Sequence, residues 1–367
     1  MKPDVPKKAK ACVLTEPGKF EIKMVDVPEP GYQEVLCKIR AVAICGSDPE
    51  IIRGDLAGVW PPSYPFIAGH EWAGEVVSIG SGVVGFEPGD RVAGQAHKGC
   101  GFCTNCLNGR YNLCLNYGRT SVGHEHYGFT VNGAYAQYAK YSQKSVSHIP
   151  GNVSYAEAAM VDTVGVALHG IELSGVTSGG TVVVIGPGPI GLSAMRLAKA
   201  CGASTTIVIG RGSRLQAAKE LGADHIIDFT TEDVYQRVEQ LTNGIGPDEV
   251  FECSGAKGTF NQAVRIVKKG GKVVLLGVAT DDVMEELPFK YITHNEIAIH
   301  GSRANPNVSA KVLALLSSGQ VVVKDMITHR FHLDDFAKAL DTFVNRKDGA
   351  VKVVILPNGE LHPFQLT

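Results

Sequence analysis

The pattern of apolar and polar positions changes near Ser154 and divides the chain into two parts. In the first part, short apolar segments alternate with glycine- and proline-containing turns, which is typical of β-strands; the clearest are 34–42, 72–79 and 91–93. Helical patterning begins at Ser154, which has capping-box spacing to Glu157. The first 150 residues are therefore expected to be rich in β-structure.

After Gly180 the pattern becomes a regular alternation of buried strands and amphipathic helices. We expect strands at 181–185, 206–209, 225–227, 249–253, 272–276 and 297–301, and helices at 190–200 and 214–221. Strands that alternate with helices of this length imply βαβ units and a parallel sheet. A further helix at 309–317 and a strand at 351–356 are expected beyond this block.

Composition and charge exclude several classes of protein. The 367 residues fit two domains, and 44% apolar with 20% charged residues is a soluble globular composition. A net charge of −2 argues against nucleic acid and anionic membranes as partners. The polar N-terminus lacks the apolar stretch of a secretory signal, so we expect a cytoplasmic protein, where clustered thiols favour metal over disulfides.

Four of the nine cysteines lie close together with the spacing C-x2-C-x2-C-x7-C: Cys100, Cys103, Cys106 and Cys114. This spacing lets one loop arrange four thiolates tetrahedrally around zinc. Four thiolates leave no open coordination position, so the site is expected to be structural and any chemistry to lie elsewhere. Two disulfides or a redox dithiol are the alternatives.

A glycine-rich turn between the strand at 181–185 and the next helix predicts a dinucleotide site. Its glycines are Gly186, Gly188 and Gly191, with Pro189 and Ile190 completing the pattern. These glycines allow a tight turn, close approach to a pyrophosphate and close helix packing, and the helix N-terminus favours the phosphates. The alternative is a glycine-rich turn that binds no ligand.

The end of the second strand of this block predicts a preference for NADP over NAD. An NAD site usually places a carboxylate there to accept from the ribose 2′-hydroxyl. This chain instead has Gly210 and Arg211, followed by Ser213 and Arg214. Guanidinium groups suit a 2′-phosphate. Alternatively, both arginines are solvated surface charges and the site tolerates NAD.

Two fragments of the first part carry metal-ligand side chains. One is Cys45-Gly46-Ser47-Asp48 and the other contains His70 and Glu71. A thiolate, an imidazole and a carboxylate suit a catalytic zinc with one open position. The residues alone are only suggestive, because a single buried Cys or His usually serves packing.

The order of these motifs resembles the zinc-dependent medium-chain dehydrogenase/reductase family over nearly the whole chain. The resemblance implies an α/β fold with a GroES-like distorted β-barrel and a Rossmann domain with a doubly wound parallel sheet. The barrel would comprise 1–165, including a structural zinc lobe at 97–116, and 303–367. The Rossmann domain would comprise 166–302.

The resemblance also assigns roles around a catalytic zinc. Cys45 and His70 match zinc ligands, Glu71 matches the adjacent carboxylate, and Asp162 occupies the place of a further ligand, which favours the polyol-like branch. Ser47 matches the hydroxyl that takes the first proton. For Asp162 the alternative is a helix-surface or capping carboxylate, and for Ser47 a turn serine.

One position departs from the family pattern. Many relatives have His five residues after the first Cys, where this chain has Glu50. A carboxylate with a raised pKa can relay protons. Glu50 can equally be a solvated surface residue, so the route of the proton stays open.

Further positions match coenzyme-side residues of the family: Ser254, Gly277, Val278, Ser302, Arg303 and Lys352. For Lys352, expected on the pyrophosphate, a solvated strand-end lysine is the alternative. The sequence His124-Glu125-His126-Tyr127 invites a second metal site, which we reject because relatives have a strand and a substrate-side loop there.

The resulting expectation is an oxidoreductase with two zinc ions per subunit, one catalytic and one structural. It would transfer a hydride between NADP(H) and a secondary alcohol or polyol and its ketone. A threonine-type amino alcohol dehydrogenase and a non-enzymatic NADP-binding sensor or structural protein are the alternatives. The family implies a homo-oligomer, either a dimer or a tetramer.

Overall fold

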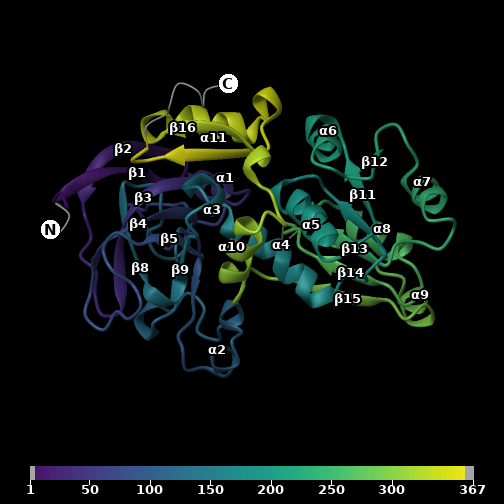
Figure 1. Ribbon diagram of the computed structural model, residues 1–367, viewed down its shortest axis with the longest axis horizontal. Coiled ribbons are helices and arrows are strands. Elements are labelled where there is room, and N and C mark those ends of the chain that lie inside the picture. Colours follow the sequence, from purple (N-terminus) through teal and green to yellow (C-terminus); the bar gives the residue numbers. More distant parts are fainter. Residues whose placement is uncertain (1–4, 281, 360–367) are drawn as a thin grey trace. The chain divides into compact units, whose positions relative to one another are not determined.

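The computed structural model describes residues 5–280 and 282–359, and the chain divides into two compact units (Figure 1). The first unit comprises Met1–Asp162, Pro306–Gly319 and Met326–Thr367; the second comprises Thr163–Asn305 and Gln320–Asp325. These boundaries lie three residues from those expected at 165 and 302. The segment 320–325 differs, because it groups with the second unit. Within this unit, Arg196 forms a bidentate pair with the Asp325 carboxylate at 2.5 and 2.6 Å.

The first unit is built on a curved seven-stranded sheet around β3. Its order is β16-β17-β3-β4-β5-β9, and β8 also pairs with β3. The register between β3 and β4 shifts twice, at Leu36/Cys37 and Ile39/Ala41, and such bulges bend a sheet toward a barrel. The strands are β3 (Glu34–Ala43), β4 (Glu71–Ile79), β5 (Arg91–Gly94), β8 (Tyr138–Ser142), β9 (Val146–His148), β16 (Ile327–His332) and β17 (Lys352–Leu356).

Smaller elements complete this unit. Two short sheets pair β1 (Lys8–Glu16) with β2 (Lys19–Asp26), and β6 (His97–Lys98) with β7 (Glu125–His126). The helices are α1 (Asp48–Arg53), α2 (Thr104–Leu107), α3 (Tyr155–Ala158), α10 (Ser309–Ser317) and α11 (Phe336–Val344). The 3-10 turns are η1 (Tyr111–Leu113), η2 (Thr120–Val122), η3 (Gln143–Ser145), η5 (Leu333–Asp335) and η6 (Lys347–Gly349). The capping box expected at Ser154 and Glu157 is present at the start of α3.

Apolar side chains of the curved sheet form the core of the first unit. The fully buried ring of Trp72 on β4 stacks on Tyr141 of β8, with ring centroids 4.0 Å apart. Phe336 of α11 packs edge-on against Tyr135, at 4.7 Å. This packing fixes the ends of β3 and β4, where the candidate ligands Cys45 and His70 lie.

The second unit is a six-stranded parallel sheet with the order β12-β11-β10-β13-β14-β15. The strands are β10 (Thr181–Ile185), β11 (Thr205–Gly210), β12 (His225–Asp228), β13 (Glu249–Glu252), β14 (Lys272–Leu275) and β15 (Ala298–Gly301). The helices are α5 (Pro189–Ala200), α6 (Gly212–Glu220), α7 (Val234–Leu241), α8 (Thr259–Ile266) and α9 (Phe289–His294). Two elements cross the division between the units, α4 (Val161–Ser174) and η4 (Lys324–Met326).

The expected strands of the second unit are observed with ends shifted by one residue at most. The sheet order doubles back at β10, so the first strand of the block lies centrally, and the predicted α/β class with a parallel sheet is confirmed. Within the residues that the structure describes, every helix is too short or too polar to cross a lipid bilayer.

Candidate active site

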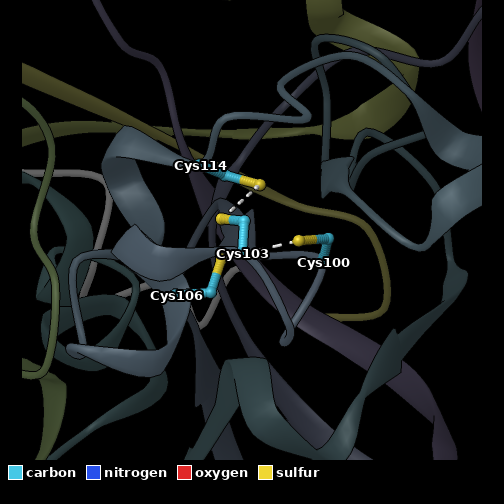
Figure 2. Close-up of side chains that lie close together, drawn as sticks. All are labelled: Cys100, Cys103, Cys106 and Cys114. Atoms are coloured by element: carbon cyan, nitrogen blue, oxygen red, sulfur yellow. Dashed lines mark hydrogen bonds between the residues drawn. The ribbon is translucent and has the colours of Figure 1, made fainter.

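The four clustered cysteines converge on one point of the loop that carries α2 and η1 (Figure 2). Their Sγ atoms all lie within 4.8 Å of one another, and all four thiols are free. The Sγ atoms of Cys100 and Cys106 lie 3.9 Å apart, and those of Cys103 and Cys114 lie 4.0 Å apart. Sulfurs about 2.3 Å from one tetrahedral zinc have a similar separation, whereas a disulfide requires about 2 Å.

Backbone and amide donors around this cluster favour thiolates. Partial burial alone would raise the pKa of Cys100. Hydrogen bonds from the Asn116 amide and from the N–H groups of Phe102 and Cys103 outweigh it and lower the pKa to about 6. The N–H groups of Cys106 and Leu115 lower the pKa of Cys103. Burial prevails at the other two thiols: it raises the pKa of Cys106 to about 12 and also raises the pKa of Cys114. The lobe therefore fits zinc in its geometry and in its set of four sulfur ligands.

A second set of ligand atoms lies where β3 ends and β4 begins. The thiol of Cys45, the imidazole of His70 and the carboxylate of Glu71 lie within 4.8 Å of one another. His70 and Glu71 are buried, and Cys45 is partly exposed. Gly69 makes this placement possible: its φ is +91°, and a Cβ there would lie 2.9 Å from the ring of Tyr135.

Asp48 links the ligands to the core. This fully buried carboxylate lies 3.6 Å from Nδ1 of His70 through Oδ1. Its Oδ2 accepts from the N–H of Cys45 at 2.8 Å and from the hydroxyl of Tyr135 at 2.7 Å. At 3.6 Å the contact is longer than a hydrogen bond, and neither atom has a hydrogen-bond partner among the described residues. The carboxylate nevertheless lies on the Nδ1 side of the ring, which leaves Nε2 of His70 for a metal. No sequence motif assigns a role to Asp48 or to Tyr135.

The charges around His70 suit a bound cation. Burial alone would lower the pKa of His70, but the Cys45 thiolate and the Asp48 carboxylate outweigh it and raise the pKa to about 10. Burial in turn raises the pKa of Asp48. Negative potential that stabilises an imidazolium would also stabilise Zn²⁺, and a thiolate, an imidazole and a carboxylate are zinc ligands.

Lys352 forms a buried ion pair with Glu71. Lys352 is 1% exposed, so the alternative of a solvated strand-end lysine is wrong. Its Nζ balances the charge of a carboxylate in the ligand cluster. The predicted contact of Lys352 with a coenzyme pyrophosphate stays a prediction.

Asp162 lies in the first turn of α4, buried next to this cluster. Its Oδ1 accepts from the N–H of Ala96 at 3.3 Å, and its charge contributes to the raised pKa of His70. Its carboxylate does not belong to the group of ligand atoms within 4.8 Å that the described residues form. Asp162 is thus no surface carboxylate, and its ligand role stays a prediction.

The two residues expected in proton transfer lie on α1. Ser47 is the N-cap residue, and its Oγ is buried without a hydrogen-bond partner among the described residues. Glu50 lies one turn further along and is partly exposed. The buried Ser47 hydroxyl, two residues from Cys45, is therefore available to accept a hydrogen bond from a bound ligand. The relay roles of both residues stay predictions.

The glycine-rich turn has the geometry that a dinucleotide requires. Gly186 has a φ of +100°, and a Cβ on Gly191 would lie 2.0 Å from the carbonyl oxygen of Gly186. Helix α5 begins directly after Gly188, so Pro189 and Ile190 form its first turn and its N-terminal N–H groups face the turn. The expected coenzyme residues Ser254, Gly277, Val278, Ser302 and Arg303 follow the carboxyl ends of β13, β14 and β15, where nucleotides bind in such sheets.

The loop after β11 presents arginine to solvent. Arg211 is exposed at the N-cap of α6, with its guanidinium 5.7 Å from the ring centroid of Phe229. Gly210 is buried, and a Cβ there would lie 2.4 Å from Cδ of Pro187. Ser213 lies exposed in the first turn of α6, and Arg214 follows it, partly exposed.

Aromatic rings form a wall against His70, comprising Trp60, His97, His126 and Phe129. The Phe129 ring lies 4.6 Å from that of His70 and stacks on His126 at 3.8 Å. His126 stacks in turn on His97 at 3.8 Å, and Trp60 meets Phe129 edge-on at 5.1 Å. Nδ1 of His126 lies 2.5 Å from the Tyr117 hydroxyl, and Nδ1 of His124 accepts from the N–H of Gly118 at 3.1 Å. The family resemblance implies Trp60 and Phe129 as pocket-lining residues. No sequence signal adds His97 and His126 to them, because the pairing of β6 with β7 brings these two residues together.

Comparison with known proteins places these features in a family. Residues 31–151 match the alcohol dehydrogenase GroES-like domain, and residues 189–318 match the zinc-binding dehydrogenase domain. The sorbitol dehydrogenase of Bacillus subtilis (strain 168) is 36% identical over 357 residues, which cover 96% of this chain and 99% of that protein. The chain belongs to the zinc-binding medium-chain alcohol/polyol dehydrogenase family.

Another relative is named for a different substrate, and a similar solved structure contains NADP. The L-threonine 3-dehydrogenase of Bacillus licheniformis is 34% identical over 347 residues, 93% of this chain and 96% of that protein. A zinc-binding dehydrogenase of Sinorhizobium meliloti 1021, solved with bound NADP, superposes with a TM-score of 0.87 at 32% identity, covering 96% of this chain and all of that chain.

These findings confirm the expected domains, zinc sites and class of coenzyme. The dehydrogenase has a GroES-like domain and a Rossmann-type domain, a structural four-cysteine zinc site, a catalytic Cys/His/Glu zinc site and an NAD(P) coenzyme. It is a zinc-dependent NAD(P) alcohol/polyol dehydrogenase. The alternative of a non-enzymatic sensor is disfavoured, because Cys45, His70 and Glu71 are retained together with their supporting residues.

Proposed function

We propose that this dehydrogenase prefers NADP to NAD and interconverts secondary alcohols or polyols with their ketones. The observation that carries the coenzyme preference is the loop after β11. Gly210 offers no carboxylate to a ribose 2′-hydroxyl, and the exposed guanidinium of Arg211 follows it. A 2′-phosphate gains charge-assisted hydrogen bonds from such a group, whereas a 2′-hydroxyl gains little.

The surroundings of Arg211 support this proposal. Its guanidinium lies 5.7 Å from the Phe229 ring centroid, which restricts where the charge can lie. Its charge also helps to lower the pKa of Asp228, although hydrogen bonds from Thr230 are the main cause. An arginine that is only a solvated surface charge would require neither the contact with Phe229 nor that with Asp228.

In the proposed reaction, a bound NADP would supply the acceptor for the hydride that the carbinol carbon loses. The alcohol is oxidised to a ketone while the oxidised coenzyme is reduced, and the hydroxyl proton leaves separately. Zinc, when bound, supplies the Lewis acidity that favours loss of this proton. The Asp48 carboxylate faces Nδ1 of His70 at 3.6 Å, and the Ser47 hydroxyl accepts the proton and passes it toward Glu50 or solvent.

The aromatic wall supports a substrate that is apolar on one side. Trp60 and Phe129 lie beside His70, so carbon atoms of a substrate at the metal would face rings on that side. Similarity to a sorbitol dehydrogenase favours polyols. Similarity to an L-threonine 3-dehydrogenase makes an amino alcohol the second candidate.

The test is kcat/KM for a panel of polyols, diols, secondary alcohols and threonine, each with NADP and NAD. We expect a preference for NADP with a polyol or secondary alcohol, and a loss of that preference in Arg211→Gln and Arg214→Gln. A preference for NAD in the unsubstituted enzyme would overturn the coenzyme proposal, and threonine as the best substrate would overturn the substrate class. We also propose a homo-oligomer, a dimer or tetramer, which light scattering can measure.

A further inference from the structure

Glu252, the last residue of β13, is a buried carboxylate surrounded by hydrogen-bond donors. The residue is 3% exposed. Its Oε1 accepts from the N–H and the hydroxyl of Ser254 at 2.9 and 2.5 Å. The same oxygen accepts from the N–H of Gly255 at 3.0 Å, and the hydroxyl of Thr259 lies 2.9 Å from it and 2.6 Å from the carbonyl oxygen of Ala256. The loop from 253 to 259 is therefore wrapped around one carboxylate group.

The backbone of Glu252 holds a second loop. Its carbonyl oxygen accepts from the N–H groups of Leu276 and Gly277 at 2.8 and 2.9 Å. A Cβ on Gly277 would lie 2.6 Å from Oε2 of Glu252 and 2.2 Å from the nitrogen of Gly255. The turn after β14 thus packs directly on the carboxylate.

The same cluster contacts the glycine-rich turn after β10. A Cβ on Gly186 would lie 2.9 Å from Cβ of Ser254 and 3.0 Å from its nitrogen. Gly255 adopts a φ of +64°, and a Cβ there would lie 2.5 Å from the carbonyl oxygen of Val278. Three turns at the carboxyl edge of the sheet meet at van der Waals distance, and Glu252 is the charged group that joins two of them.

The donors to Glu252 are neutral. The ion pairs found among residues 5–280 and 282–359 do not include it. A buried carboxylate without a counter-ion persists where donors replace its hydration shell. Any movement of the loop from 253 to 259 would remove those donors, so the charge and the loop conformation depend on each other.

Glu249 at the opposite end of β13 offers a matched comparison. It is also buried, at 1% exposed, and its Oε1 accepts from the N–H and hydroxyl of Thr177 at 3.1 and 2.7 Å. The two residues share a strand, burial and hydrogen-bond chemistry. Only Glu252 lies at the edge where the coenzyme binds.

We propose that Glu252 is a positioning residue of the coenzyme site, because its buried carboxylate holds the turn after β13 and its main-chain carbonyl holds the turn after β14, both beside the glycine-rich turn. The inference rests on the dinucleotide site of the proposed function but not on the preference for NADP over NAD. Without the carboxylate, the turn after β13 loses the acceptor of its donors, and both coenzymes bind more weakly while the zinc sites in the other unit are unaffected.

The test compares Glu252→Gln with Glu249→Gln in the full zinc-loaded enzyme. The readouts are the Kd of NADPH and NADH from fluorescence, zinc content, thermal stability and the KM for coenzyme. Glu252→Gln places an N–H2 group among N–H donors. We expect it to raise both Kd values about tenfold, equivalent to one charge-assisted hydrogen bond. Glu249→Gln should lower stability to a similar degree and leave both Kd values unchanged.

Equal effects of the two substitutions on coenzyme binding, or an unchanged Kd in Glu252→Gln, would overturn the proposal. Should Glu252→Gln fail to fold, Thr259→Val removes one donor at nearly constant volume. Thr259→Val should then raise the Kd of both coenzymes by a smaller factor than Glu252→Gln. An unchanged Kd in Thr259→Val would also overturn the proposal. Failure of the unsubstituted enzyme to bind either coenzyme would instead contradict the proposed function.

Discussion

The hydroxyl of Tyr135 donates a hydrogen bond of 2.7 Å to the Asp48 carboxylate, which lies 3.6 Å from Nδ1 of His70. A catalytic zinc ligand is thus oriented through two fully buried residues. Removing the carboxylate should leave the His70 tautomer unspecified. We expect Asp48→Asn to lower the affinity of the catalytic zinc site about 10- to 100-fold, and Tyr135→Phe by less, measured as zinc retained against a chelator.

Tyr141→Phe provides the control for the tyrosine variant. Tyr141 is equally buried, but its hydroxyl has no hydrogen-bond partner among the described residues. Zinc retention should therefore stay at the level of the unsubstituted protein. Equal zinc loss in Tyr135→Phe and Tyr141→Phe would show that general packing, and not the contact with Asp48, holds the site.

Cys103→Ser should separate the two zinc sites. Its Sγ lies 4.0 Å from that of Cys114 in a closed four-thiolate cluster that has no position for a substrate. We expect bound zinc to fall from two ions to one and the Tm to fall by roughly 5 °C or more. The kcat of molecules that keep the catalytic zinc should stay nearly unchanged.

The exposed Cys201 supplies the control for this experiment. Cys201→Ser should retain both zinc ions and the original Tm. If Cys103→Ser kept its stability but lost hydride transfer, the four-cysteine site would be the chemical one, and the assignment of the two sites would be reversed.

Gly210 should resist conversion to the carboxylate of an NAD site. A Cβ at this position would lie 2.4 Å from Cδ and 2.5 Å from Cγ of Pro187 in the glycine-rich turn. Gly210→Asp must therefore displace that turn. Overpacking of this kind costs about 1–3 kcal/mol, so we expect both coenzymes to bind about tenfold more weakly.

A smaller side chain at position 187 should restore part of the coenzyme affinity that Gly210→Asp loses. Pro187→Ala removes both crowding atoms, so the double variant Gly210→Asp/Pro187→Ala is expected to bind NADH better than Gly210→Asp alone. The Kd of NADH for the two variants decides the matter. Tight NADH binding by Gly210→Asp alone would contradict the steric account.

Asp248 should make the Rossmann-type domain sensitive to acid. Partial burial alone would raise its pKa. Hydrogen bonds from Lys268 and from the N–H of Thr181, the latter at 2.7 Å, outweigh it and lower the pKa below the usual range. A carboxylate with a lowered folded-state pKa stabilises the fold above its unfolded pKa of about 3.9, and this stability is lost as the pH falls through the folded-state pKa.

The measurement is the Tm difference between the unsubstituted protein and Asp248→Asn as a function of pH. We expect Asp248→Asn to cost about 1–2 kcal/mol near neutral pH, and the difference to shrink below about pH 4. Asp26→Asn is the control, because Asp26 is 85% exposed and pairs only loosely with Lys8 at 3.7 Å. A difference independent of pH would contradict the assignment.

The parts of this protein that sequence predicted are those in which one short segment carries the whole signal. The glycine-rich turn after β10 and the four-cysteine lobe each lie within about fifteen residues, so spacing alone specifies their geometry. The βαβ alternation was equally local, and its strand ends were correct to within one residue.

The contacts that sequence could not predict join distant segments. Tyr135 reaches Asp48 from another loop, and Lys352 reaches Glu71 from the last strand. A solvated strand-end lysine therefore remained an alternative for Lys352, and the structure excludes it because this first residue of β17, which pairs with β3, is buried. The role of Glu252 could not be predicted either, because the residues that donate to it lie in a loop without a recognisable motif.

The most direct test of the whole account follows deuterium from a carbinol-deuterated polyol or secondary alcohol into the coenzyme by mass spectrometry. The zinc-loaded enzyme should produce NADPH that carries one deuterium. Cys45→Ser, which lacks one of the three clustered ligand atoms, should still bind NADPH but transfer no deuterium. Tight coenzyme binding without deuterium transfer from any alcohol in the panel, or undiminished transfer by Cys45→Ser, would contradict a zinc-dependent alcohol dehydrogenase built on this site.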